Sequence, residues 1–187
     1  MIYNIKRLIR LTMLLVCTAC TSQPKQVTEV SEPAPIYPDY ANVTIPYNIA
    51  PLNFLLRNEV SALQVTVSGQ QESLTVHGNR KVCFPLRKWK NLLEAEKGQT
   101  LTVTITAKVE GKWLQYPTFT WKVVSEKLDS FLSYRLIEPG YEVWNTIQLC
   151  ERNIETFEEK VIADNNLVDG NCMNCHIYGK QSGNLSL

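Results

Sequence analysis

Apolar and polar residues alternate with a period of two through residues 52–124 of the chain. The longest run is 101–109, where Leu, Val, Ile, Ala and Val are separated by Thr and Lys. Shorter runs of the same kind begin at Leu63, Leu74 and Phe119. Such a period places one face of a strand in a core and the other face in water. Short strands at this spacing are typical of sandwiches, so we predict a mainly β fold with an Ig-like β-sandwich.

Two glycine-containing dipeptides punctuate this alternation. Gly78-Asn79 separates two short apolar-polar runs, and Glu110-Gly111 follows the long strand. Glycine readily takes the positive φ that tight two-residue turns need. Each dipeptide is therefore predicted to close a β-hairpin between the runs that flank it.

One segment between the strands has helical spacing instead. Pro85 suits the first position of a helix, and Leu86, Trp89 and Leu93 recur at the spacing of one helix face. Gly98 follows as a stop signal. We therefore predict that one crossover helix interrupts the strands of the sandwich.

The alternation fades after residue 124. Residues 128–166 mix aromatic residues with a Pro-Gly pair and a charged stretch, and we predict that they form a packed extension of the sandwich. Residues 172–187 contain few large apolar side chains, so this short C-terminal segment is expected to be an appendage to the core. No internal repeat is visible in the sequence.

The opening residues have the pattern of an export signal. Three basic residues among the first ten precede the apolar run 11–16, which is too short to span a bilayer, and small residues lead directly to Cys20. This arrangement resembles the lipobox of bacterial lipoproteins, except that Cys17 stands where Leu is usual. The resemblance implies a signal peptide over 1–19 and a lipid on Cys20. The alternatives are an ordinary cleaved signal peptide and an uncleaved anchor, and both would also export the chain.

Composition divides the rest of the chain. Residues 20–38 are rich in Pro, Ser, Thr, Gln and Glu and are predicted to form a flexible tether. The sandwich domain is assigned to 39–145 and a C-terminal extension, which includes the haem-motif segment, to 146–187. The 19 Lys and Arg nearly balance the 18 Asp and Glu, so no basic patch for nucleic acid is indicated.

The run Cys172-Met173-Asn174-Cys175-His176 matches the attachment motif of c-type haem. On one helical turn, two thiols three residues apart lie on the same side and face the two haem vinyl groups, while the adjacent His places a ring nitrogen on the iron. Cys172 and Cys175 are thus predicted to bind haem c covalently, and His176 is predicted to ligate its iron. Export agrees with this, because c-type cytochromes receive their haem outside the cytoplasmic membrane.

Three other interpretations of the motif stay open. In the first, Cys172 and Cys175 form a disulfide. In the second, the cysteines belong to a zinc site that is completed by His176 and another residue. In the third, the motif is a remnant without a ligand. The only other histidine is His77, which is distant in sequence. Since no Met or His follows the motif, a haem iron would be five-coordinate, bound by a small ligand, or completed by His77 or another protein.

Other candidate residues are assigned structural roles. His77 is expected at an exposed sheet edge, and Cys83 either forms a disulfide with Cys150 or fills a small buried position. Seven aromatic residues could pack in the core or form a binding platform, and their alternating positions favour core packing. They are Trp89, Trp113, Trp121, Trp144, Tyr116, Phe119 and Phe131. A solvated acidic face is expected from Glu155, Glu158 and Glu159. No Ser/His/Asp set, phosphate loop or metalloprotease pattern is found, so no enzymatic activity is predicted.

Several longer phrases resemble one family. They are Tyr37-Pro38-Asp39-Tyr40, Val43-Thr44-Ile45-Pro46, Asn48-Ile49-Ala50-Pro51-Leu52-Asn53-Phe54 and Tyr134-Arg135-Leu136-Ile137-Glu138-Pro139-Gly140-Tyr141, together with Cys-x-Asn-Cys-His. Over roughly residues 36–176, the chain resembles exported lipoproteins in which an N-terminal β-domain and a haem-type motif precede a TolB-like β-propeller. It departs from them by ending where the propeller would begin. The resemblance therefore carries over only Cys172, Cys175 and His176, as haem-type positions.

The combined expectation is an envelope lipoprotein, anchored to a membrane by lipid and exposed to the periplasm or the cell surface. It would bind haem c for electron transfer or haem-linked sensing with a redox or envelope protein partner. One alternative is a non-catalytic β-sandwich that binds a polymer or another envelope protein. The other is a truncated propeller-family lipoprotein whose cysteine pair is a disulfide or a relic.

Overall fold

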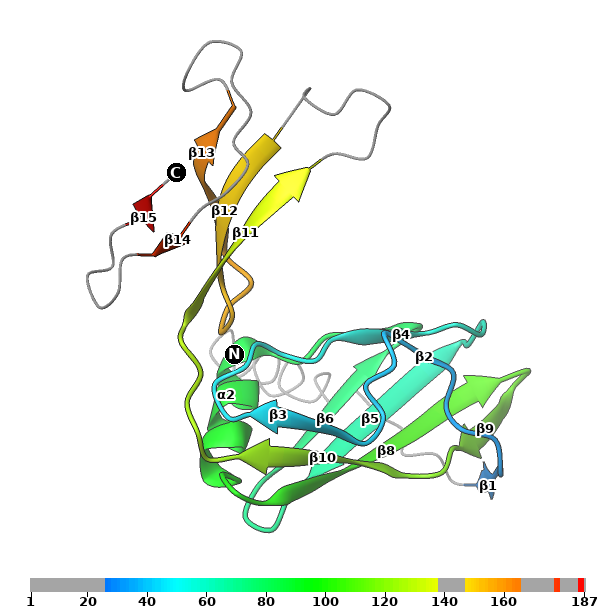
Figure 1. Cartoon of the computed structure of the whole chain (residues 1–187). Coiled ribbons are helices and arrows are strands. Elements are labelled where there is room, and N and C mark those ends of the chain that lie inside the picture. The colour runs from blue at the N-terminus through cyan, green and yellow to red at the C-terminus, as the bar shows by residue number, and fades with distance from the viewer. Residues whose placement is uncertain (1–25, 138–146, 166–176, 179–184, 187) are drawn as a thin grey trace, which may run out of the picture.

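The computed structural model describes residues 26–137, 147–165, 177–178 and 185–186. Over these residues the fold is mainly β, as the alternation predicted, with several sheets and one helix (Figure 1). A sandwich forms the larger body, and a separate three-stranded sheet projects from one end of it (Figure 1).

The larger sheet of the sandwich is built around the long strand β8, whose two edges are used differently. β5 pairs antiparallel with one edge and β6 pairs with β5, while β10 and β9 share the other edge, pairing with the first and second halves of β8. β3 and β1 then add parallel to β10 and β9. The strands are β1 (Val27–Glu29), β3 (Val43–Pro46), β5 (Ala62–Ser68), β6 (Ser73–Gly78), β8 (Thr100–Val109), β9 (Lys112–Gln115) and β10 (Phe119–Val124).

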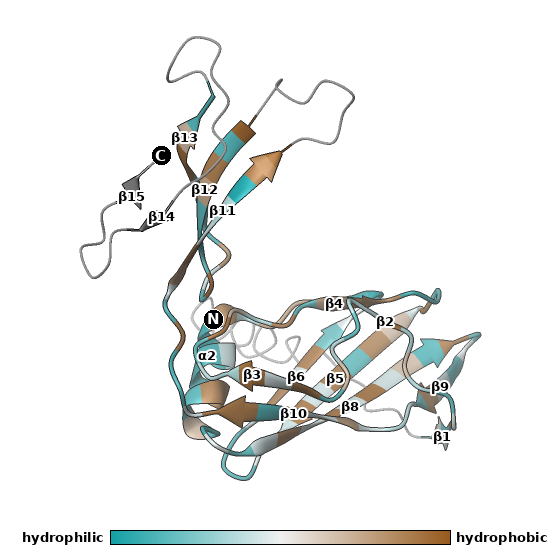
Figure 2. Ribbon diagram, in the orientation of Figure 1, coloured by the Kyte–Doolittle hydropathy of each residue, from teal (hydrophilic) through white to brown (hydrophobic). Residues whose placement is uncertain are grey.

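A smaller three-stranded sheet packs against the larger one. Its strands, in spatial order, are β2 (Ile36–Tyr37), β4 (Phe54–Leu56) and β7 (Lys81–Val82). Inward residues of both sheets belong to one core, in which Leu101, Val103, Ile105 and Ala107 of β8 are at most 1% exposed. Apolar and polar residues alternate visibly along β5 and β8 (Figure 2). The predicted period-two strands are therefore confirmed.

The helix α2 (Leu86–Ala95) is the predicted crossover helix, because it connects β7 of the smaller sheet to β8 of the larger sheet. Pro85 precedes its first residue, Trp89 and Leu93 are buried, and Gly98 follows with a φ of 74°. Leu86 differs from the prediction, since its side chain is 38% exposed.

Two buried tryptophans join the helix to the sheet at the centre of the core. Trp89 of α2 and Trp121 of β10 have ring centroids 5.6 Å apart in an edge-to-face arrangement. The Nε1–H of Trp89 donates to the Ile49 carbonyl at 2.9 Å, and that of Trp121 donates to the Tyr40 carbonyl at 2.7 Å. Because a buried indole donor without an acceptor is costly, these bonds hold the segments that contain Tyr40 and Ile49 against the core.

Glu96 is a fully buried carboxylate that ties the end of α2 to the turn between β5 and β6. It accepts hydrogen bonds from the backbone N–H groups of Gln70 (3.0 Å), Gln71 (2.6 Å) and Glu72 (2.8 Å). Burial alone would raise the pKa of Glu96, but the three donors outweigh burial and the pKa lies below its ordinary value. Gly69 permits this approach, because an added Cβ would lie 2.2 Å from the Glu96 Cδ.

The two predicted hairpins have different outcomes. Glu110-Gly111 joins β8 to β9 as predicted, and both residues have positive φ, 48° and 83°. The hairpin predicted at Gly78-Asn79 is wrong, because β6 pairs with β5 whereas β7 pairs with β4, so the chain passes between sheets at this corner. Gly78 is required for close approach instead, since an added Cβ would lie 2.5 Å from the Lys81 carbonyl oxygen.

The tether predicted over residues 20–38 is wrong from residue 27 onward. β1 pairs with β9, β2 pairs with β4, and Ile36 is buried in the core. Proline-rich, polar composition therefore did not prevent this segment from entering the sandwich, because strand pairing satisfies its backbone groups and Ile36 supplies apolar contact. The sandwich consequently begins before residue 39.

The packed extension predicted for residues 128–166 is also corrected. β11 (Phe131–Ile137), β12 (Ile147–Asn153) and β13 (Glu159–Asp164) form their own antiparallel sheet, which we call the second sheet. The strands of the sandwich end with β10 at Val124, so the boundary predicted at residue 145 is misplaced. The turn between β12 and β13 points back toward α2 and provides the attachment to the sandwich (Figure 1).

Candidate functional site

The residues predicted to attach haem, Cys172, Cys175 and His176, lie outside the described residues, as does the predicted lipid attachment site Cys20. β14 (Ile177–Tyr178) directly follows the motif and pairs antiparallel with β15 (Leu185–Ser186). Within the described ranges, no three His, Cys, Asp or Glu side chains are placed to hold a metal ion. The helix in that part of the chain is not long and apolar enough to cross a membrane.

The cysteines and His77 do not form a further site in the described part of the chain. His77 is exposed on the edge strand β6, as predicted. Cys83 is exposed and Cys150 is buried, and both are free thiols. Neither the disulfide between them nor the buried position for Cys83 is therefore correct. Burial raises the pKa of Cys150 first, and the nearby Glu159 carboxylate raises it further.

The aromatic residues mostly pack in the core, as predicted. Trp89, Trp121, Tyr116 and Phe119 are buried, while Trp113 is half-buried. Phe131 is an exception, because it lies on β11 and is 56% exposed. Trp144 lies outside the described residues.

The second sheet exposes large apolar side chains. Six of them are between 38% and 56% exposed, namely Phe131, Leu132, Leu136, Ile137, Val161 and Ile162. Strand register places Leu132, Leu136 and Val161 on one face of the sheet, which they share with Tyr134, Arg152 and Glu159 and which we call the apolar face. Large apolar side chains left in water on a small sheet indicate a binding surface.

A hydrogen-bonded cluster around Glu155 attaches the second sheet to the sandwich. The carboxylate accepts hydrogen bonds from Asn48 Nδ2 (3.1 Å) and the Ser130 hydroxyl (2.8 Å), and it forms an ion pair with Lys90 of α2 (3.3 Å). The bonds from Asn48 and Ser130, with the contribution of Lys90, outweigh partial burial and lower the pKa of Glu155 to about 2. The prediction of a solvated face is therefore wrong for Glu155, although Glu158 and Glu159 are exposed.

The turn that carries Glu155 is shaped by Asn153. Its side-chain oxygen accepts a hydrogen bond from the Glu155 backbone N–H at 2.8 Å, and its own N–H donates to the Glu158 carbonyl at 2.8 Å. Phe157 takes a φ of 71°, which is strained for a bulky residue. The turn is joined directly to the sandwich by the Ala50 N–H, which donates to the Ile154 carbonyl at 2.7 Å.

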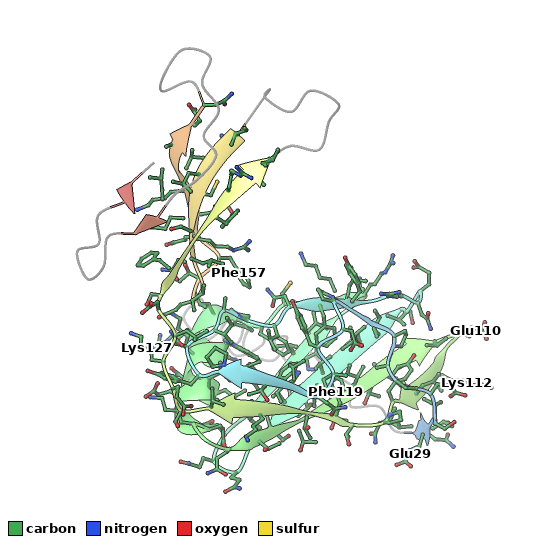
Figure 3. The ribbon with its side chains drawn as sticks, viewed as in Figure 1. Glu29, Glu110, Lys112, Phe119, Lys127 and Phe157 are labelled. Carbon is green, nitrogen blue, oxygen red and sulfur yellow. The ribbon has the colours of Figure 1, made fainter. Side chains whose placement is uncertain are left out.

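A pocket of about 460 Å³ lies where this turn meets the sandwich. We call it the junction pocket. The sandwich contributes Tyr40, Ile49, Ala50, Pro51, Leu52, Asn53 and Lys81, and the second sheet and its turn contribute Arg152, Ile154 and Phe157. Figure 3 shows Phe157 at the end of the second sheet that faces the sandwich. A pocket of this size is within the range of small-molecule sites.

Sequence patterns did not identify the Glu155 cluster or the junction pocket. The partners of Glu155 are 107, 65 and 25 positions away along the chain. The pocket likewise combines residues from β7, from the segment around residue 50 and from the second sheet. No local period or spacing links such residues.

Comparisons with known proteins assign no family to the chain. No family model matches the chain, and neither the curated proteins nor the solved structures give a match. The resemblance to propeller-bearing lipoproteins therefore stays a prediction.

Proposed function

We propose that this protein is an exported envelope lipoprotein that binds haem c covalently and acts in electron transfer or haem-linked sensing with a partner protein. The observation that carries the proposal is the Cys172-to-His176 motif in a chain that begins with an export signal. The signal also places Cys20 at the expected lipid attachment point. The chemistry of the motif requires thiols and an imidazole in this order, whichever fold presents them.

The exposed apolar side chains of the second sheet are suited to contact with a porphyrin. A porphyrin is a large apolar ring and needs apolar protein surface that excludes water. The apolar face of Leu132, Leu136 and Val161 belongs to the sheet that precedes the motif in the chain. Residues 165–171 separate β13 from Cys172, and an extended chain of that length spans at most about 25 Å.

The chemistry of each residue in the motif determines its role in haem binding. Cys172 and Cys175 would form the two thioether bonds, and His176 would ligate the iron. A bound haem c supplies reversible one-electron chemistry or an iron that takes a small ligand. The apolar face would shield one side of the ring from water and so raise the energetic cost of charge on the iron, which influences the reduction potential.

Expression with a haem-maturation system tests the proposal. The mature protein should show the absorbance of covalent haem, and its intact mass should include haem. Changing both Cys172 and Cys175 to Ser should abolish both signals, whereas Cys83→Ser, a matched change of an exposed free thiol, should retain them. Absence of covalent haem, while a known c-type cytochrome matured in parallel carries it, contradicts the proposal. A mass lower by two protons would instead identify a disulfide and favour the non-catalytic binding module.

A further inference from the structure

The junction pocket has walls that are fixed to the rest of the protein. On the sandwich side, the carbonyls of Tyr40 and Ile49 accept hydrogen bonds from the buried indoles of Trp121 and Trp89. On the other side, the turn is held by the Glu155 cluster and by the Ala50–Ile154 backbone bond. A ligand entering the pocket would therefore lose little affinity to ordering of the protein.

The polar side chains that line the pocket are rich in hydrogen-bond donors. The side-chain oxygen of Asn53 accepts from the Phe84 backbone N–H at 2.9 Å, which leaves its amide N–H₂ without an acceptor among the described residues. Lys81 and Arg152 also have no ion-pair partner in that part of the chain. Three side chains thus present donors, two of them cationic, and no carboxylate lines the pocket. Such a set is complementary to an anion.

The pocket also has an apolar lining. Ile49, Pro51, Leu52 and Ile154 provide an aliphatic lining, and the ring of Phe157 lies beneath the Arg152 guanidinium at 5.6 Å from the ring centroid. Glu159, the register partner of Arg152, forms no ion pair with it and instead accepts a hydrogen bond from the Tyr134 hydroxyl. The pocket therefore combines a cation that forms no ion pair among the described residues with an aromatic ring and an aliphatic lining.

We propose that the junction pocket binds a small amphipathic anion, that is, a carboxylate on an aromatic or aliphatic body. The carboxylate pairs with Arg152 and Lys81, the Asn53 amide donates to it, and the body packs on Phe157 and the aliphatic lining. This inference does not rest on haem attachment. The same chemistry has two sources, a free ligand or the carboxylate edge of the attached haem.

Equilibrium binding of 1-naphthoate to the full mature chain tests the proposal, with the neutral 1-naphthamide as the ligand control. The matched protein variants are Arg152→Gln and Lys81→Gln in the pocket, and Lys112→Gln at the opposite end of the sandwich (Figure 3). We expect naphthoate to bind saturably, and each pocket variant to weaken it by about tenfold, the scale of one lost charge-assisted contact. Lys112→Gln should bind naphthoate as tightly as the parent, and the neutral ligand defines the background. Thermal unfolding of each variant shows whether it is folded.

Two results would overturn the proposal. One is the absence of saturable naphthoate binding. The other is naphthoate binding that is unchanged in both Arg152→Gln and Lys81→Gln, or equalled by naphthamide. Lys81→Gln provides the decisive comparison if Arg152→Gln disturbs the second sheet.

Comparing the haem-matured chain with the Cys172→Ser/Cys175→Ser double variant distinguishes the two sources. Binding by both forms shows that attached haem leaves the pocket open, which favours a free ligand. Binding by the double variant alone shows that attached haem fills the pocket, which favours the haem carboxylates. Both outcomes support the anion-binding role of the pocket, and the double variant preserves the test if no haem is attached at all.

Discussion

Replacing Glu155 by glutamine should loosen the attachment of the second sheet to the sandwich. Glutamine has nearly the same volume, and its one side-chain oxygen can still accept from Asn48 and Ser130, which both donate to Oε1. It has no charge, however, and it would place an amide group where Oε2 pairs with Lys90. The turn that carries residue 155 is the part of the second sheet that bonds to the sandwich, through Ile154 as well as through Glu155. The substitution therefore acts at the joint between the two bodies.

The magnitude follows from the pKa of Glu155. A fall from 4.5 to about 2 corresponds to about 3 kcal/mol of preference for the ionised carboxylate at roughly 1.4 kcal/mol per pH unit. Because 21% of the side chain is exposed, solvent screening reduces this value, and we expect a loss of about 1–2 kcal/mol in the free energy of unfolding. For a domain of this size, the melting temperature should fall by about 2–8 °C.

The dependence on pH has a defined sign. The folded-state pKa of Glu155 lies below the unfolded value, so its stabilisation is fully present above pH 4.5 and is lost as the pH falls toward about 2. A protonated glutamic acid resembles glutamine in shape and charge. The difference in stability between the parent and Glu155→Gln should therefore be largest near neutral pH and should approach zero near pH 2.

Urea unfolding at several pH values between 7 and 2 measures this difference. Glu158→Gln is the matched control, because it removes one charge from the same turn at an exposed position. Hydrogen exchange of β11–β13 should also accelerate in Glu155→Gln alone. Equal unfolding free energies for the parent and Glu155→Gln at pH 7, or a difference that stays constant down to pH 2, would refute the role assigned to the carboxylate.

Three further predictions concern the core, the thiols and the C-terminal segment. Glu96→Ala leaves three buried N–H donors without their acceptor and should cost about 3 kcal/mol in chemical unfolding; a cost below about 1 kcal/mol would contradict it. In the native protein, iodoacetamide should label Cys83 rapidly and spare the buried Cys150, as mass spectrometry of peptides can show; equal labelling would contradict the burial. Deleting residues 170–187 should leave the sandwich cooperatively folded with a thermal midpoint within a few degrees of the haem-free parent, because β14 and β15 pair only with each other among the described strands. Loss of the cooperative transition would show that this segment completes the core.

The predictions that were confirmed depend on residues close together in the sequence. The run 101–109 reads as a half-buried strand because side chains alternate between the two faces of any strand. Glu110-Gly111 predicts a hairpin turn because few residues tolerate positive φ. The helix between Pro85 and Gly98 is likewise defined by spacing and end signals within its own length.

The predictions that were wrong concern contacts between distant segments. Gly78-Asn79 has hairpin chemistry, yet the flanking strands belong to different sheets. Residues 27–37 have the composition of a linker, yet they pair with β9 and β4. In both places the structure depends on which strand the segment pairs with, and that strand is not adjacent to it in sequence.

Sequence alone determined the mainly β class, the position of the crossover helix and the motif from Cys172 to His176 that motivates the haem proposal, because each is written in neighbouring residues. Tertiary structure alone decided that β9 and β10 share one edge of β8, that Glu155 is a partly buried anchor, and that Lys81, Asn53 and Arg152 line one pocket. Periodicity and turn chemistry report the local backbone state. The free energy of docking depends on which surfaces and charges meet after the chain has folded, and no local pattern records that.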